Sequence, residues 1–344
     1  MSSDMQSRLQ DYCARACPDK QSVQVTSLTS INAGWESDVY SFDVEHGPPE
    51  ARQLDSLILR VYPGDDAQAK SAREFEGMRQ LHKAGYPVPH VLILERDSSH
   101  FGKRFVIMER IEGDVLWPIL LSSPRQRRQE LLTLFCELFV RLHALDWRAF
   151  VDDPGRYEQQ GPYLFIDQWL SGARGALERF PPSGFLHVLE WLEARRDQVP
   201  CQRPSPVHWD YHPNNVLLRD DGSAVVIDWT QFDISDSRFD LAWTLLLTSS
   251  HQGAEWRGLI LSEYERLAGA EVEHIEYFDV AACLKRLGSI AASLSFGPEK
   301  LGMRPGAQAN MRRQMGAFRR VYALLLERTG IGVPEVERLF ASPP

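Results

Sequence analysis

The feature that most constrains this 344-residue chain is a polar loop followed at once by a short hairpin. The loop covers residues 208–215, and two aliphatic runs follow it at 216–219 and 224–227. The pair Asp221-Gly222 lies between these runs, and Asp-Gly between aliphatic segments is a strong signal for a tight β-hairpin. The sequence therefore predicts a loop of acidic and amide side chains at the open end of a hairpin.

A turn centred on the Asp-Gly pair determines which residues of the hairpin face each other. It places Asp220 opposite Ser223 and, at the open end, Asn215 opposite Asp228. Directly opposed residues of antiparallel strands have Cβ atoms about 5 Å apart. A carboxamide and a carboxylate at that spacing suit Mg²⁺, which takes few protein oxygens and otherwise keeps waters or phosphate oxygens. Asn215 and Asp228 are therefore the expected metal ligands.

This order of histidine, aspartate, asparagine, hairpin and aspartate resembles the catalytic segment of kinases. The chain resembles the aminoglycoside phosphotransferase family in particular, from about residue 23 to residue 250. Four segments carry the resemblance: His208-Trp209-Asp210-Tyr211-His212-Pro213-Asn214-Asn215-Val216-Leu217, Val226-Ile227-Asp228-Trp229, Arg238-Phe239-Asp240-Leu241-Ala242 and Leu142-His143-Ala144-Leu145. The resemblance implies a two-lobed, protein-kinase-like α+β fold, ATP (or GTP) and Mg²⁺ as cofactors, and Asp210 as the base that accepts the proton of the substrate hydroxyl.

The resemblance also implies where the nucleotide would bind. In this fold a glycine-bearing turn between two strands covers the phosphates, and Gly34 and Ser37 lie in such a turn. Residues 108–111 correspond to the linker whose backbone meets the base, which assigns Glu109 and Ile111 to base binding. Whether the base is adenine or guanine is not readable from these residues.

The third predicted strand carries Arg60, which the resemblance places at the α- and β-phosphates, where lysine is commoner in kinases. Arginine can hold phosphate through a bidentate fork in place of a point charge. Its expected partner is a glutamate on the following helix. Glu74 lies nearer than Glu76 to the apolar face of Phe75 and Met78, and the helix glutamate of the family aligns with it.

The hydrophobic pattern divides the chain into three parts. We predict a leading helix in residues 1–20, a nucleotide-binding lobe in 21–110, and a catalytic and substrate-binding lobe in 111–344. Alternating apolar residues in the nucleotide-binding lobe predict a small, mostly antiparallel sheet with one main helix at 67–83. The last part is mainly helical, most clearly at 125–145.

The short distance between Asp228 and Asp240 bears on the phosphoryl acceptor. Twelve positions (240 − 228) leave no room for the long segment on which a protein substrate docks, so we expect a small molecule with a hydroxyl group. Asp240 is expected to accept hydrogen bonds from the polar loop, and His208 to brace that loop. For His212, contact with the substrate and simple packing are equally favoured.

Charge and cysteine content exclude several classes of protein. A formal net charge of −9 gives no basic surface for nucleic acid or an anionic membrane, and weakly favours a cationic aminoglycoside-like or amino-alcohol acceptor. Five scattered cysteines suit a reducing compartment. Neither a signal peptide nor a run of about 20 apolar residues is found, so we expect a soluble, cytoplasmic protein. The oligomeric state is not readable.

Two other functions stay open at this stage. Because Arg60 stands where kinases commonly have lysine, the chain could be a nucleotide-binding regulator without catalysis. Alternatively, His208, Asp210, His212 and Asp228 could form the His/Asp cluster of a metal hydrolase. That second function would leave the whole N-terminal lobe unexplained.

Overall fold

The computed structural model describes residues 2–16, 20–31, 37–64, 66–179, 184–296 and 311–341. The chain forms two compact units. Unit 1 combines residues 1–114 with 217–231, and unit 2 combines residues 115–216 with 232–344. Residues 217–231, which follow the polar loop, thus belong to the same unit as the N-terminal sheet, although helical segments flank them in the sequence.

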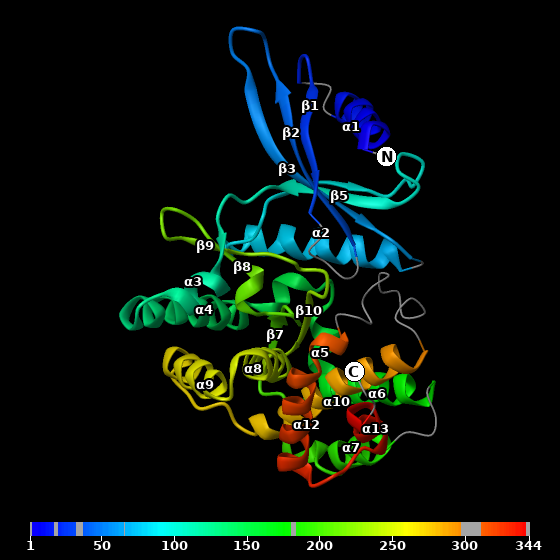
Figure 1. The fold of residues 1–344 in the computed structure, drawn as a ribbon, viewed down its shortest axis with the longest axis vertical. Helices are drawn as coiled ribbons and strands as arrows, with labels where there is room; N and C mark the ends of the chain where they lie inside the picture. Colours follow the sequence, from blue (N-terminus) through cyan, green and yellow to red (C-terminus); the bar gives the residue numbers. More distant parts are fainter. Residues whose placement is uncertain are drawn as a thin grey trace. The chain divides into compact units, whose positions relative to one another are not determined.

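Unit 1 is built on an antiparallel sheet with the strand order β1-β2-β3-β5-β4 (Figure 1). Its strands are β1 (Gln24–Ser30), β2 (Asp38–His46), β3 (Gln53–Tyr62), β4 (Val91–Glu95) and β5 (Arg104–Glu109). The alternation expected from the sequence is present in β3, where Leu57, Leu59 and Val61 are buried. Helix α1 (Ser2–Ala16) packs on β1, and α2 (Ala67–Lys83) packs on β3, β4 and β5.

Helix α2 has the predicted bounds, but its buried face is rotated from the one expected. Phe75 is only half-buried, whereas Ser71, Glu74, Met78 and Leu81 are buried at helical spacing. Glu74 is therefore at the centre of the face that packs on the sheet, and a charged group there requires a partner.

Unit 2 is mainly helical. The bounds of its helices are α3 (Leu116–Ser122), α4 (Arg125–Ala144), α5 (Pro154–Gln159), α6 (Leu164–Glu178), α7 (Phe185–Glu193), α8 (Ser237–Gln252), α9 (Glu255–Ala268), α10 (Ile275–Phe296), α12 (Met315–Thr329) and α13 (Pro334–Ala341). Helix α8 is buried along most of its length, because it packs on α9, α10 and α12. A strand pair, β7 (Pro204–Val207) and β10 (Asp233–Asp236), lies beside it and was not predicted.

The expected register of the hairpin after the polar loop is wrong by one residue. Strands β8 (Val216–Leu218) and β9 (Ala224–Val226) are joined by a loop in which the Arg219 N–H donates to the Ser223 carbonyl at 2.8 Å. Gly222 has a φ of +84° and its N–H donates to the Arg219 carbonyl at 2.9 Å. A left-handed glycine of this kind closes a three-residue loop with a bulge, so Ser223 pairs with Arg219 and not with Asp220.

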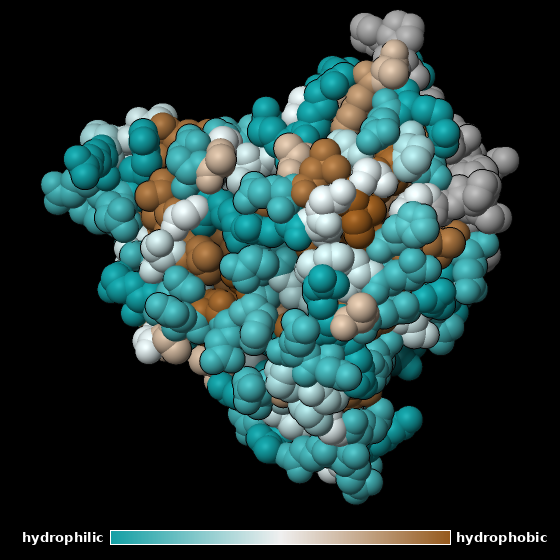
Figure 2. Space-filling model, turned by 90° about the horizontal axis from the view of Figure 1, so that it is seen from below, coloured by the Kyte–Doolittle hydropathy of each residue, from teal (hydrophilic) through white to brown (hydrophobic). Residues whose placement is uncertain are grey.

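Hydrophilic residues cover most of the face of the molecule drawn in Figure 2. Leu54, Leu92 and Leu259 are among the few large apolar side chains exposed on the described residues. Within that described part of the chain, no helix is both long enough and apolar enough to cross a membrane.

Candidate active site

Asp240 anchors the polar loop of unit 2 through its backbone. The carboxylate, fully buried on α8, accepts hydrogen bonds from the N–H of His208 at 2.6 Å and of Trp209 at 2.8 Å. These bonds confirm the role expected for Asp240. They also hold Trp209 at a φ of +64°, a left-handed conformation that is unfavourable for a bulky residue and persists only where neighbours enforce it.

The Asp210 carboxylate has a defined orientation. Trp243 Nε1 on α8 donates to Asp210 Oδ1 at 3.2 Å, and His212 Nε2 lies 3.5 Å from Oδ2. The Asp210 N–H donates to His208 Nδ1 at 3.3 Å, which confirms His208 as a brace of the loop. Burial alone would raise the pKa of Asp210, but His212, His208 and the Trp243 hydrogen bond together hold it well below its ordinary value. Asp210 is therefore ionised at neutral pH.

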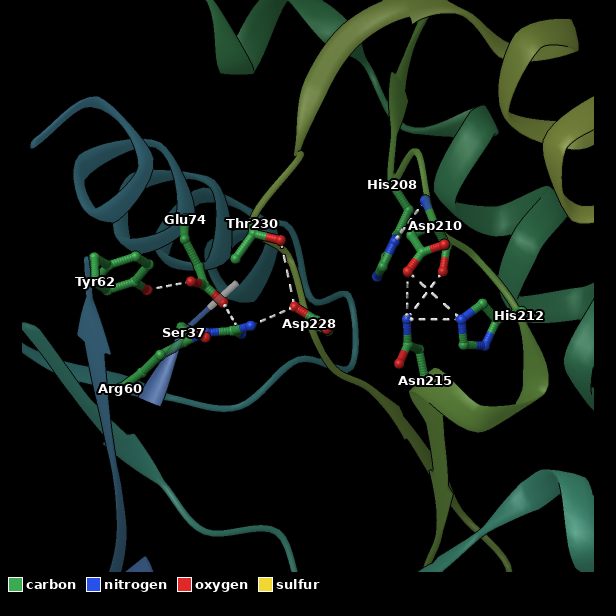
Figure 3. Close-up of polar contacts among 10 residues, drawn as sticks. All are labelled: Ser37, Arg60, Tyr62, Glu74, His208, Asp210, His212, Asn215, Asp228 and Thr230. Carbon is green, nitrogen blue, oxygen red and sulfur yellow. Dashed lines mark hydrogen bonds and ion pairs between the residues drawn. The ribbon is translucent and has the colours of Figure 1, made fainter. Parts of the chain in front are cut away.

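Asn215 follows the loop in a short 3₁₀ turn that begins at Pro213. Its Nδ2 donates to the Asp210 carbonyl at 3.0 Å, and this bond fixes the plane of the carboxamide (Figure 3). The side-chain oxygen of Asn215 then points away from that bond and can act as a ligand.

In unit 1, Arg60 joins two carboxylates (Figure 3). Its Nη1 donates to Glu74 Oε1 at 2.7 Å, its Nη2 donates to Asp228 Oδ1 at 2.7 Å, and its Nε donates to Ser37 Oγ at 2.9 Å. The ion pair between the strand cation and the helix glutamate is thus confirmed for Arg60 and Glu74. All three nitrogens of the guanidinium are engaged.

Burial of Arg60 and Glu74 changes the pKa of both side chains. Desolvation raises the pKa of the fully buried Glu74, which also accepts a hydrogen bond from the Tyr62 hydroxyl. Burial would lower the pKa of Arg60, but the carboxylates of Glu74 and Asp228 raise it above its ordinary value. Asp228 has a φ of +68°, so a second functional position has a left-handed backbone.

Asn215 and Asp228 offer the kind of oxygens that Mg²⁺ prefers. The Asp228 side chain is 35% exposed, and it is Oδ1 that accepts the bonds from Arg60 and Thr230. A carboxamide and a carboxylate are each an oxygen donor of a type that Mg²⁺ accepts beside waters or phosphate oxygens. Among the described residues, by contrast, no three His, Cys, Asp or Glu side chains are grouped as a metal hydrolase would need.

The structure does not test the remaining predicted nucleotide contacts. Gly34 lies outside the described residues. Glu109 ends β5, its N–H donates to the His90 carbonyl at 2.8 Å, and its carboxylate accepts from the His90 N–H at 3.1 Å. Ile111 follows it in the linker and is half-buried. The roles of Glu109 and Ile111 in binding a base stay predictions.

Two residues that position the loop were missed from the sequence. Trp243 was not singled out, although it lies three positions after Asp240 and so on the same face of a helix. His143 was noted only for its resemblance, yet its Nε2 lies 3.3 Å from Asp240 Oδ2 and its Nδ1 lies 2.8 Å from the Tyr264 hydroxyl. The contacts of His143 join α4 to α8 and α9, and that of Trp243 joins α8 to the polar loop, so no local pattern reveals them.

Comparisons with known proteins bear on the family and the fold. The model of the phosphotransferase enzyme family (APH) matches residues 27–275. The chain belongs to this family. A solved structure of a candidate aminoglycoside phosphotransferase from Ralstonia eutropha is 17% identical, with a TM-score of 0.67 over 94% of this chain and 97% of the other. A complex of the aminoglycoside phosphotransferase APH(4)-Ia with ADP and hygromycin B is 20% identical, with a TM-score of 0.54 over 94% and 99%. The two-lobed, protein-kinase-like fold is thereby confirmed.

One protein with a similar sequence is much longer than this chain. The mouse acyl-CoA dehydrogenase family member 10 is 30% identical over 198 residues, which is 55% of this chain and 18% of the mouse protein. The chain thus spans about a fifth of the length of this relative. Its name refers to a much longer protein than the part that matches.

Proposed function

We propose that the protein is a kinase that transfers the γ-phosphoryl group of ATP (or GTP) to a hydroxyl group of a small molecule. The observation that carries the proposal is the ionised Asp210 carboxylate, oriented by Trp243 and His212 on a loop that Asp240 anchors. Phosphoryl transfer depends mainly on positioning the reactants and on neutralising charge. A carboxylate held in this way would position the hydroxyl of the acceptor.

On the acceptor side, Asp210 would accept a hydrogen bond from the substrate hydroxyl and aim its oxygen at the γ-phosphorus. As the new oxygen–phosphorus bond forms and the bond to the nucleoside diphosphate breaks, the hydroxyl proton moves to Asp210. A strongly ionised carboxylate accepts this proton late, when the substrate oxygen has already lost most of its basicity to phosphorus. Both carboxylate oxygens have a neighbour that orients them, Trp243 Nε1 at Oδ1 and His212 Nε2 at Oδ2.

On the nucleotide side, Asn215 and Asp228 would hold Mg²⁺, which neutralises phosphate charge when it is bound. Arg60 would contribute its fork of N–H donors to the α- and β-phosphates, and Glu74 keeps that fork oriented. Ser37 and Gly34 would cover the phosphates, while the linker at Glu109 and Ile111 would meet the base. Each of these assignments agrees with the residue types present.

The identity of the acceptor has two sources of support that point in different directions. The net charge of −9 and the hygromycin B complex of a solved relative favour an aminoglycoside-like or amino-alcohol acceptor. The name of the mouse relative, which refers to acyl-CoA, adds compounds of that class as a second possibility, and the match covers 18% of that protein. The charge of a whole chain is weak evidence, because the groups at the site determine which acceptor binds.

The deciding experiment compares phosphoryl transfer by the wild-type protein and by Asp210→Asn across a panel of hydroxyl compounds of both classes. We expect acceptor-stimulated ADP formation that Asp210→Asn lowers by about 10³-fold or more, with MgATP binding retained. Asp152→Asn, which removes an exposed carboxylate of the same unit, is the matched control and should be fully active. Full activity of Asp210→Asn would refute the mechanism.

The alternative is a nucleotide-binding regulator without catalysis. It was kept because of Arg60, but Arg60 makes the ion pair to Glu74 that the lysine of other kinases makes. Tight MgATP binding with no stimulation by any acceptor in the panel would favour the regulator over the kinase.

A further inference from the structure

Lys285 contacts both tryptophans that lie next to Asp210. Its ammonium lies 4.5 Å from the ring centroid of Trp243 and 4.9 Å from that of Trp209, in a cation–π arrangement with both. Trp209 directly precedes Asp210 in the polar loop, and Trp243 Nε1 donates to Asp210 Oδ1 at 3.2 Å. Lys285 belongs to α10, which packs on α8, the helix that carries Trp243. One side chain of α10 thus contacts both the residue before the base and the residue that orients it.

The ring of Trp209 has to be held in place, because the backbone of this residue is strained. Trp209 has a φ of +64°, and a bulky residue keeps such a conformation only where its surroundings enforce it. The Asp240 carboxylate accepts a hydrogen bond from the Trp209 N–H at 2.8 Å. The ring itself lies beside Phe239, with 5.7 Å between the ring centroids, and beside the ammonium of Lys285. Lys285 therefore supplies one of the contacts that keep Trp209, and with it the start of the loop, in this conformation.

The contact with Trp243 acts on the hydrogen bond to Asp210. A cation over the face of an indole draws electron density from the ring, which makes the Nε1–H a stronger donor. Trp243 is buried, so water competes little for this donor, and the bond to Asp210 Oδ1 depends on where the ring lies. Lys285 thus affects both the strength and the direction of this bond.

A half-buried lysine is unfavourable where only packing is required. Its ammonium is strongly hydrated, and a methionine or a leucine would fill the space over two indole rings without losing that hydration. We propose that Lys285 is a positioning residue of the kinase, which holds the rings of Trp209 and Trp243 and thereby the orientation of the Asp210 carboxylate. This inference rests on the proposed function, in which Asp210 is the base, and extends the site to α10.

Nuclear magnetic resonance of the full-length protein with ¹⁵N-labelled tryptophan reads both contacts. The indole N–H signal of Trp243 is assigned by its loss in Trp243→Phe, and that of Trp209 by its loss in Trp209→Phe. Asp210→Asn should shift the Trp243 signal, which shows that this signal reports the bond to Asp210. We expect Lys285→Met to shift both signals, and Lys285→Arg, which keeps a cation over the rings, to shift them less. The indole signals of the other tryptophans show whether each variant is folded.

Kinetic measurements on the same variants test the effect on the base. Lys285→Met should lower kcat about fivefold and leave KM for MgATP unchanged, whereas Lys285→Arg should keep most of the activity. In the background of Trp243→Phe, Lys285→Met should lower kcat by a smaller factor, because residues that act through one another are not additive. Arg195→Met is the matched control, because it removes a half-buried cation that lies 4.2 Å from the ring centroid of another tryptophan, Trp191. It should leave kcat and the Trp209 and Trp243 signals unchanged.

The outcomes separate this inference from the kinase proposal. An active protein in which Lys285→Met leaves kcat or the Trp243 signal unchanged would overturn the positioning role while the kinase function stands. A loss of kcat that is equally large with and without the Trp243 indole would also overturn it, because Lys285 would then act by another route. If no compound stimulates ADP formation by the wild type, the kinase proposal fails and the signals decide. Shifts of the Trp243 signal in both Lys285→Met and Asp210→Asn would then support the positioning of Asp210 by Lys285, and an unchanged signal in Lys285→Met would exclude it.

Discussion

Arg60 Nη2 donates a 2.7 Å hydrogen bond to Oδ1 of Asp228, so the proposed phosphate cation is bonded directly to a proposed metal ligand. The same guanidinium neutralises Glu74, which is buried on α2. Arg60 therefore has two separable roles. It compensates a buried carboxylate in the folded protein, and it presents N–H donors where phosphates would bind.

These two roles predict different behaviour for a single and a double variant. Arg60→Met leaves Glu74 buried without its cation, which should lower the free energy of unfolding by about 3–5 kcal/mol. Arg60→Met combined with Glu74→Met removes both charges and should recover most of that stability, but should still bind MgATP poorly. Denaturant unfolding and nucleotide titration measure the two effects. Tight MgATP binding by the double variant would contradict the phosphate role.

The left-handed backbone of Asp228 predicts a difference between two substitutions. Asparagine tolerates a φ of +68°, whereas alanine is strained there, so Asp228→Ala should be about 1 kcal/mol less stable than Asp228→Asn. Both variants should lose Mg²⁺-dependent turnover, because each removes the carboxylate. Thermal unfolding and a Mg²⁺ titration of activity test this. Equal stabilities would show that the backbone at Asp228 relaxes, and retained turnover would exclude it as a ligand.

Asp240 is predicted to position the loop without taking part in the chemistry. Asp240→Asn exchanges one accepting oxygen for an amide that cannot accept the N–H bonds of both His208 and Trp209. We expect a loss of about 1–3 kcal/mol in stability and a clear fall in kcat, with KM for MgATP unchanged. His143→Gln, which perturbs the contact between the His143 ring and the Asp240 carboxylate, should show the same pattern more weakly. A change confined to KM for MgATP would contradict a positioning role.

Much of this architecture could be predicted because its signals are local. The periodicity that defines α2 lies within the helix itself, and the spacing of Asp210, Asn215 and Asp228 lies within one loop and one hairpin. The family and the two-lobed fold followed from those residues and are confirmed. The pairing of Arg60 with Glu74 was implied by the family resemblance and, for Glu74, by its position on the helix, and the structure contains it.

What could not be predicted depends on contacts between distant segments. Strand β7 contains Pro204 and Pro206, which argue against a strand when read alone, and it exists because β10 pairs with it. The observed register differs from the expected one because Gly222, and not Asp221, has a positive φ, which closes a three-residue loop in place of the commoner two-residue loop. Lys285 of α10 lies over the rings of Trp209 and Trp243 because α10 packs on α8, a contact that no local pattern reveals.

The pKa of Asp210 predicts how activity depends on pH. Folding lowers the pKa of Asp210. The ionised carboxylate therefore stabilises the folded protein at pH values above the unfolded pKa of about 3.9. This stabilisation is lost as the pH falls through the folded pKa. Between pH 5 and 8 the group stays ionised and should not shape the rate profile. Trp243→Phe removes one hydrogen bond that lowers this pKa, so it should move any acid limb of kcat that reflects Asp210 towards higher pH. Profiles of kcat for the wild type, Trp243→Phe and the control Trp191→Phe, taken down to pH 4, test this. An acid limb of the wild-type kcat that reflects Asp210 within this range would contradict the lowered pKa, and a shift of equal size in both variants would contradict the role of the Trp243 hydrogen bond.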